Sequence, residues 1–306
     1  MTKRIELPPS LNGSGFSVRD AADAGVPASR LRTPTLEAPF WGVRAEQGAV
    51  TDLASRATAY FAWLGEFAVV SHFSAAKLWG IPLPLHFTHD PRLHVSVAPD
   101  VTPPRSQGIA GHHVSLHPMD VTSRYGVRLT TQTRTVCDLA GYLPEDDLLA
   151  ALDFLLWRER PEDERCSIQE IVRAIDRHQT KRGMARLRKV VPLASDHADS
   201  APESKIRYRI LDAGLPAPDV NVDLFDKWGR FLARPDLSYP QFMMSLDYEG
   251  EHHRTDGVQW EKDIHRVPRL EDAGWQHTRI SKSDLHNSDE FLARLARRLR
   301  ERGWTP

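Results

Sequence analysis

The chain contains very little cysteine: Cys137 and Cys166 are the only two in 306 residues. Two cysteines are too few for a disulfide framework or a zinc cluster, so we expect both to be reduced thiols. No apolar run approaches the length of a membrane span, and the first residues, Met-Thr-Lys-Arg-Ile-Glu-Leu-Pro-Pro, lack the apolar core of a signal peptide. The composition therefore predicts a cytoplasmic protein that has no membrane partner.

An excess of charge of one sign is also lacking. The 40 Lys and Arg residues are balanced by 41 Asp and Glu residues, so the net charge is −1. This balance excludes a global positive field, and any contact with DNA must come from local patches. The most basic stretch is 293–302, where Leu295 and Leu299 form the apolar side of a helix with an arginine-rich outer face. That face is either a solvated surface, the simpler interpretation, or a DNA-binding stripe.

A length of 306 residues is sufficient for two or three domains. The clearest linker is 192–202, which is rich in proline, alanine, serine and aspartate. We therefore predict a DNA-binding segment over 1–50, a middle domain over 51–192 and a C-terminal domain over 193–306. Helical and strand patterns alternate in the two larger segments, which predicts an α/β (α+β) fold class.

The N-terminal segment has the pattern of a winged helix-turn-helix. Residues 17–25 read as a capped helix that ends at a glycine, residues 28–32 begin a second helix, and residues 40–43 read as a strand. In this motif the second helix enters the major groove. Arg30 and Arg32 would then contact phosphates or bases. The alternative is that both are ordinary surface charges.

The most informative pattern is a set of carboxylates in the last third of the chain. Asp247 and Glu249 alternate, so their side chains share one face of a strand. A hairpin would bring Asp236 beside them, and Glu203 opens a helix upstream. Crowded carboxylates repel each other, and a hard divalent cation such as Mg²⁺ relieves that repulsion. Taken together the four predict a site for Mg²⁺ or Mn²⁺, although each one alone reads as a surface or turn residue.

This order of a helix glutamate, a hairpin aspartate and an acid-x-acid strand resembles the PD-(D/E)XK nuclease core. The sequence Glu-Gly-Glu-His-His at 249–253 is similar to the branch related to very-short-patch-repair endonucleases. The resemblance implies a mixed sheet flanked by helices, with Asp236, Asp247 and Glu203 as metal ligands. It also implies hydrolysis of DNA phosphodiester bonds by a metal-activated water, in defence or DNA repair.

The chain departs from the nuclease pattern at the position of the residue that orients the attacking water. Many of these nucleases have a lysine that orients the attacking water, and this strand has Glu249. The usual order in the repair-like branch is Glu-x-Asp, whereas here it is Asp-x-Glu, which moves each carboxylate by about a methylene. That branch uses histidine for proton transfer, so His252 or His253 is the candidate general base. The alternative for this histidine pair is a solvated turn.

Basic residues follow the acidic motif. Arg254 comes directly after the histidines, and Arg266 lies three residues after Asp263 on one helix face. Asp263 and Arg266 are either a helix salt bridge or, as the resemblance implies, residues at the edge of the site, where Arg266 would steady a phosphate. Arg254 and Arg266 complete the predicted DNA contacts.

Two upstream motifs carry a second resemblance. Ser-His-Phe-Ser-Ala-Ala-Lys-Leu-Trp-Gly (71–80) and Leu-Thr-Thr-Gln-Thr-Arg-Thr-Val-Cys-Asp-Leu-Ala (129–140) resemble the AbiEi-type regulators of bacterial toxin–antitoxin loci. In that family a winged helix precedes an α/β domain, which implies DNA and a cognate toxin or defence protein as partners. The sequence thus predicts a metal-dependent DNA endonuclease with an appended DNA-binding region. The alternative is a non-catalytic DNA-binding transcriptional regulator or antitoxin, favoured by the missing lysine and the neutral charge.

Overall fold

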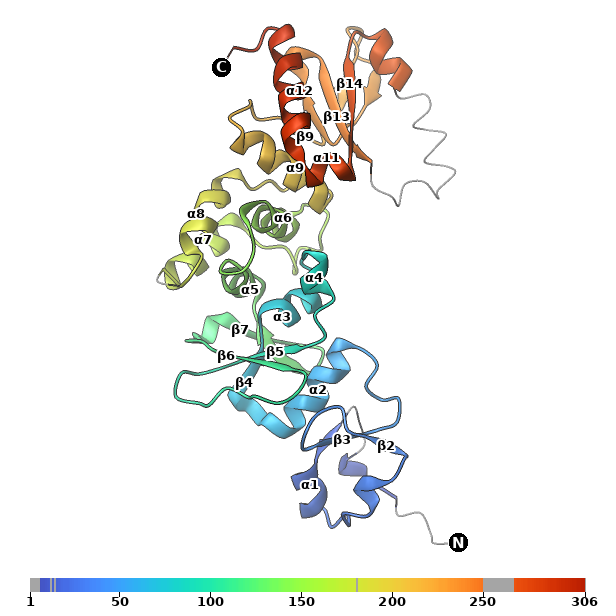
Figure 1. The fold of residues 1–306 in the computed structure, drawn as a ribbon, viewed down its shortest axis with the longest axis vertical. Helices are drawn as coiled ribbons and strands as arrows, with labels where there is room; N and C mark the ends of the chain where they lie inside the picture. Colours follow the sequence, from blue (N-terminus) through green and yellow to red (C-terminus); the bar gives the residue numbers. More distant parts are fainter. Residues whose placement is uncertain (1–5, 12, 14, 180, 250–266, 306) are drawn as a thin grey trace. The chain divides into compact units, whose positions relative to one another are not determined.

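The computed structural model describes residues 6–11, 13, 15–179, 181–249 and 267–305 (Figure 1). The chain divides into two compact units, Met1–Gly141 and Tyr142–Pro306. Helices and mixed sheets occur in both units, so the fold is mixed α/β, as the sequence predicts. No helix in the described part of the chain is long and apolar enough to cross a membrane.

The first unit opens with a small antiparallel sheet in the order β1 (Phe16–Ser17), β3 (Val43–Glu46) and β2 (Leu36–Glu37). Helix α1 (Val18–Asp23) begins after Ser17, whose hydroxyl accepts the Asp20 N–H at 2.9 Å. This cap satisfies one of the unpaired donors at the helix start, as the sequence predicts.

The second helix expected in this segment is only a three-residue 3-10 turn, Arg30–Arg32. Pro34 follows closely and disfavours helical geometry at Thr33, so the turn cannot extend. The described residues between α1 and β2 therefore contain no α-helix of the length of a recognition helix. The winged-helix interpretation stays a prediction.

A five-stranded mixed sheet forms the main body of the first unit. Its order is β6 (Ile109–His113), β5 (Leu93–Val97), β4 (Ala68–Val70), β8 (Val127–Thr130) and β7 (Val121–Arg124). The accompanying helices are α2 (Leu53–Leu64), α3 (His72–Trp79), α4 (Leu85–Thr88) and α5 (Gln132–Leu139). Val70, Val95 and Leu129 are fully buried in its core, which explains the short apolar runs of these strands.

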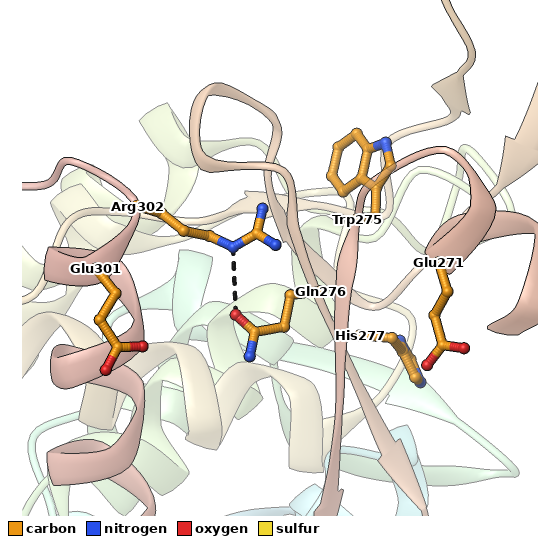
Figure 2. A pocket seen from close by; sticks show the side chains of 6 residues that line it. All are labelled: Glu271, Trp275, Gln276, His277, Glu301 and Arg302. Atoms are coloured by element: carbon orange, nitrogen blue, oxygen red, sulfur yellow. Dashed lines mark hydrogen bonds between the residues drawn. The ribbon is translucent and has the colours of Figure 1, made fainter.

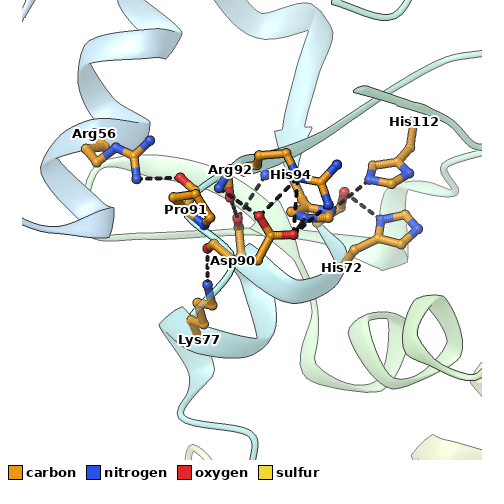
Figure 3. Close-up of polar contacts among 10 residues, drawn as sticks. Arg56, His72, Lys77, Asp90, Pro91, Arg92, His94 and His112 are labelled. Carbon is orange, nitrogen blue, oxygen red and sulfur yellow. Dashed lines mark hydrogen bonds and ion pairs between the residues drawn. The ribbon is translucent and has the colours of Figure 1, made fainter. Parts of the chain in front are cut away.

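Three histidines gather where α3 meets this sheet (Figure 3). The rings of His72 and His112 stack with centroids 3.8 Å apart, and His94 Nδ1 lies 3.0 Å from His112 Nε2. Asp90 Oδ2 lies 3.3 Å from His94 Nε2, and Arg92 forms an ion pair with the same carboxylate. Burial lowers the pKa of His94, and Asp90 opposes that effect. A neutral imidazole therefore suits this buried position.

The second unit begins with helices that pack against the C-terminal part of the chain. They are α6 (Glu145–Leu156), α7 (Ile168–Arg177) and α8 (Met184–Val190), followed by α9 (Ala201–Asp212). Acidic side chains on α6 pair with basic ones on α9: Asp146 with Arg209 at 2.9 Å, Asp153 with Arg207 at 2.6 Å, and Asp147 with Lys205. These ion pairs join α6 and α9 within one compact unit, which begins at Tyr142. The predicted domain boundary at 192/193 stays a prediction.

A four-stranded mixed sheet completes the second unit. Its order is β14 (Gln276–Ser281), β13 (Met244–Glu249), β12 (Leu237–Tyr239) and β9 (Asp219–Val220), and only the pair β13–β14 is parallel. A separate hairpin joins β10 (Leu224–Phe225) to β11 (Phe231–Ala233). The last elements are α11 (Lys282–His286) and α12 (Ser288–Glu301).

The apolar face of this sheet packs against α9 and α12. Met244 and Leu246 of β13 are fully buried in one cluster with Ile206 of α9 and with Leu295 and Leu299 of α12. The predicted apolar side of the arginine-rich helix therefore lies in the core. The alternate positions along β13 point to the opposite face, where the polar residues of the candidate site lie.

Candidate functional site

The structure places Asp236 beside Asp247. In the antiparallel pair β12–β13, Leu237 is opposite Leu246, so the preceding Asp236 comes next to Asp247. The backbone N–H of Asp236 donates to Asp247 Oδ1 at 3.0 Å, and the N–H of Tyr248 donates to Asp236 Oδ2 at 2.6 Å. Each aspartate thus accepts a hydrogen bond from the backbone at the other's strand, which fixes the two side chains at one edge of the sheet.

Glu249 follows Asp247 on the same face of β13 but in a different environment. The side chain of Asp247 is only 8% exposed, whereas that of Glu249 is 54% exposed and forms an ion pair with Arg279 of β14 at 3.0 Å. Glu249 therefore lies at the solvent end of the strand. The Arg279 guanidinium faces Glu249 at the position where the nuclease pattern has a lysine.

Glu203 is connected to the strand segment of Asp236 by hydrogen bonds to Asn221. It lies in the first turn of α9, where its own N–H donates to the Ser200 hydroxyl at 3.4 Å. Glu203 Oε2 accepts from Asn221 Nδ2 at 2.9 Å and from the Asp199 N–H at 3.1 Å. The Asn221 N–H in turn donates to the Asp236 carbonyl at 3.0 Å. Asn221 thus connects the helix glutamate to the hairpin aspartate.

Burial raises the pKa of Glu203 above its ordinary value. Hydrogen bonds from Ser200, Asn221 and the Asp199 N–H oppose this effect, and the charge of the Asp199 carboxylate adds to it. The charged form of Glu203 is therefore held in an unfavourable environment. Such an environment is typical of residues kept for function rather than for stability.

His277 is a neighbour of the site that the sequence did not identify. Its Nε2 lies 3.5 Å from Asp247 Oδ2, and its Nδ1 lies 3.1 Å from the Ser245 hydroxyl. The parallel register of β13 and β14 pairs Ser245 with His277 and creates both contacts. That register depends on long-range strand pairing, which the sequence does not specify. The only local signal for the position of His277 is the alternating pattern of β14 itself.

A polar hollow of about 660 Å³ adjoins His277 (Figure 2). Gln276 and Arg302 lie on its wall, joined by a hydrogen bond from Arg302 Nε to Gln276 Oε1 at 3.3 Å, as Figure 2 shows. Arg302 also donates to the carbonyls of Phe242 and Met243. These bonds hold the end of α12 against the sheet, so Arg302 has a structural role here.

The donor set fits a magnesium ion better than a zinc ion. Within the described ranges, no group of three or more His, Cys, Asp or Glu side chains is placed to hold a metal. Asp236 and Asp247 provide two carboxylates, and Mg²⁺ commonly binds through one or two carboxylates, several waters and the phosphates of its substrate. Glu203 is linked to Asp236 through Asn221, whose side chain donates to Glu203 and whose backbone N–H donates to the Asp236 carbonyl. A structural zinc site would need four protein ligands.

Several predicted residues lie outside the described residues: His252, His253, Arg254, Asp263 and Arg266. Their roles stay predictions.

Of the two predicted N-terminal DNA contacts, only Arg32 is exposed. Arg30 is 6% exposed, and its Nη1 donates to the hydroxyls of Thr33 and Thr35 at 2.7 and 2.9 Å. This guanidinium holds the turn together. Its burial argues against Arg30 as a DNA contact, because a buried side chain cannot reach a phosphate without opening the turn.

Comparisons with known proteins found two similar chains in Mycobacterium tuberculosis: uncharacterized protein Rv2248 of strain H37Rv and uncharacterized protein MT2308 of strain CDC 1551. Each is 28% identical over 262 residues, which cover 85% of this chain and 91% of the relative. A match of that length must extend into both compact units. No protein-family profile and no solved structure matches the chain.

Proposed function

We propose that the chain is a metal-dependent DNA endonuclease of the PD-(D/E)XK type, related to the very-short-patch-repair branch and acting in the cytoplasm. The observation that carries this proposal is the adjacency of Asp236 and Asp247 at one sheet edge. Two carboxylates side by side repel each other, and a divalent cation bound between them relieves that repulsion. The same two residues occupy the positions at which the nuclease pattern has its metal ligands.

Mg²⁺ or Mn²⁺ bound there would compensate the charge of the attacked phosphate and lower the pKa of a bound water. Asp236 and Asp247 would hold the ion, and Glu203 would complete the shell through water. The contact of His277 with Asp247 orients that carboxylate, in the way that residues behind metal ligands commonly do. The backbone bonds from Asp236 and Tyr248 fix the same two carboxylates before any ion binds.

In the nuclease pattern a lysine on this strand assists proton removal from the attacking water. Glu249 occupies the lysine position and is paired with Arg279. We propose that His252 or His253 accepts the proton, as in the repair-like branch. Arg32, Arg254 and Arg266 would contact the DNA backbone.

One observation favours the alternative, a non-catalytic regulator of the AbiEi type that binds DNA and a toxin or defence protein. The carboxylates of Asp236 and Asp247 already accept backbone N–H groups, and Glu249 already has a guanidinium partner. These bonds stabilise the sheet without any metal. A protein that had lost its catalytic function would retain them.

A plasmid-nicking assay separates the two functions. The full chain is incubated with supercoiled plasmid and Mg²⁺, Mn²⁺ or EDTA, next to the variants Asp236→Asn and Asp223→Asn. Asp223 is an exposed aspartate of the same unit and serves as the matched control. The nuclease proposal predicts metal-dependent nicking by the wild type and by Asp223→Asn, and its loss in Asp236→Asn. Equal nicking by all three proteins would refute the catalytic assignment, and duplex binding without nicking would support the regulator.

A further inference from the structure

We infer that the first unit contains a binding site for single-stranded nucleic acid, in which Trp41 stacks on an unpaired base and arginines contact the phosphates. The site is a hollow of about 1410 Å³ between α1, the start of β3 and the residues before β6. Its wall includes two tryptophans and three arginines: Trp41, Trp63, Arg19, Arg44 and Arg105.

The aromatic part of the site is exposed. Trp41 is 75% exposed, an unusual state for the largest apolar side chain. Its ring meets Trp63 edge to face at a centroid distance of 5.9 Å, and Trp63 packs in turn on the buried Tyr60 at 5.8 Å. Gly42 has a φ of 76°, and a Cβ there would lie 2.9 Å from Trp63 Nε1. The backbone therefore passes directly over Trp63, which leaves Trp41 projecting as a stacking platform.

The charged part of the site is positive. Among the described residues, three arginines and no carboxylate line the hollow, although acidic and basic residues are nearly equal in number over the whole chain. Arg44 is held in place because its Nε donates to the Leu31 carbonyl at 3.0 Å and its Nη1 to the Val43 carbonyl at 2.8 Å. Arg19 and Arg105 are exposed. A polyanion is the ligand whose charge complements this wall.

Unpaired bases fit this wall better than a duplex. Stacking on an indole needs a free base face, and in a duplex that face is covered by the neighbouring base pairs. The adjacent 3-10 turn, Arg30–Arg32, is too short to act as a major-groove helix. A volume of about 1410 Å³ also exceeds the range of about 300–1,000 Å³ typical of small-molecule pockets. This site rests on the proposed function in one point, the binding of DNA by the first unit. It does not depend on nuclease activity in the second unit.

The test is the fluorescence anisotropy of labelled (dT)15, (rU)15 and a 15-base-pair duplex, with the full chain in EDTA so that cleavage has no influence. Trp41→Ala should weaken binding of the single strand by about 5-fold to 100-fold. Trp41→Phe should restore much of the affinity. The control is Trp228→Ala in the second unit, because Trp228 is similarly exposed at 69% and lies beneath Lys227 and Arg230. This control should bind as the wild type does.

The arginines are tested through salt dependence. Arg19→Ala and Arg105→Ala should each reduce the slope of log affinity against log salt by about 0.7. Arg230→Ala in the second unit, where the side chain is 72% exposed, should leave the slope unchanged. A loss confined to (dT)15 identifies DNA as the ligand, and a loss confined to (rU)15 identifies RNA. Equal single-strand binding by wild type and Trp41→Ala, or binding of the duplex alone, would overturn the inference. Metal-dependent nicking would be unaffected by that outcome, so the nuclease proposal would stand.

Discussion

The ion pair between Asp153 and Arg207 offers the sharpest test of how the second unit is built. Arg207 Nη2 lies 2.6 Å from Asp153 Oδ2, with side-chain exposures of 7% and 1%. Arg207 also donates to the Leu193 carbonyl, and Asp153 Oδ1 accepts the Ser195 N–H at 2.8 Å. One guanidinium thus joins α6, α9 and the segment between them, and the position of Glu203 on α9 depends on it.

Removing one member of this pair leaves the other charge buried. Breaking a buried ion pair in this way costs about 3–5 kcal/mol. With a urea dependence of about 2 kcal/mol per molar for the unit, Arg207→Ala should lower the midpoint of its unfolding by about 1.5–2.5 M. The double variant Asp153→Leu/Arg207→Met should recover much of that loss, because it leaves no unpaired charge.

The assay is urea unfolding followed by circular dichroism and by tryptophan fluorescence. Arg297→Ala is the control, since Arg297 and Glu301 form an exposed pair at 3.9 Å that should contribute less than about 0.5 kcal/mol. A midpoint for Arg207→Ala within experimental error of this control would refute the reasoning. Separate unfolding of residues 142–192 in the wild type would also refute it, because the structure packs these residues in one unit with the four-stranded sheet.

Three further predictions concern single side chains. Because burial raises the pKa of Glu203, Glu203→Gln should raise the melting temperature at pH 7.5 by about 2–4 °C, and it should lower nicking. The gain in melting temperature should vanish below about pH 4.3, where glutamate is protonated in the folded and the unfolded chain alike. Because burial lowers the pKa of folded His94, stability is full above about pH 6.5 and falls as the unfolded chain takes up a proton below it. His94→Asn should therefore lose less melting temperature than the wild type between pH 7.5 and 5.5. Arg30→Ala should destabilise the first unit by about 1–3 kcal/mol, whereas Arg32→Ala should leave its melting unchanged and flatten the salt dependence of DNA binding.

Local signals in the sequence predicted local structure well. The start of α7, Ile168–Arg177, is readable from the sequence, because Ser167 and Glu170 have the spacing of a capping box and form one in the structure. The sequence Asp-Lys-Trp-Gly at 226–229 is typical of a hairpin turn, and it joins β10 to β11, with the Gly229 N–H bonded to the Asp226 carbonyl. Local patterns are less reliable for strands: residues 113–117 alternate like a strand, yet β6 occupies Ile109–His113, where it pairs in parallel with Leu93–Val97.

Long-range pairing accounts for what the sequence missed. The Asp236–Asp247 contact followed from alternation and a hairpin, both of which are readable in sequence. The contact of His277 with Asp247 depends on the register of two parallel strands, which no local pattern specifies. The burial of Arg30 depends on Thr33 and Thr35 folding back on it, so a basic residue expected at the surface became part of a turn.

The central claim is that Asp236 and Asp247 together bind one divalent cation. Electron paramagnetic resonance of Mn²⁺ measures this directly, because bound ion is lost from the free-ion signal without any need for activity. We expect the wild type and the control Asp223→Asn to bind one Mn²⁺ per chain, and Asp236→Asn and Asp247→Asn to lose binding. Undiminished Mn²⁺ binding in either of these two variants, or no binding by the wild type with DNA present, would contradict it.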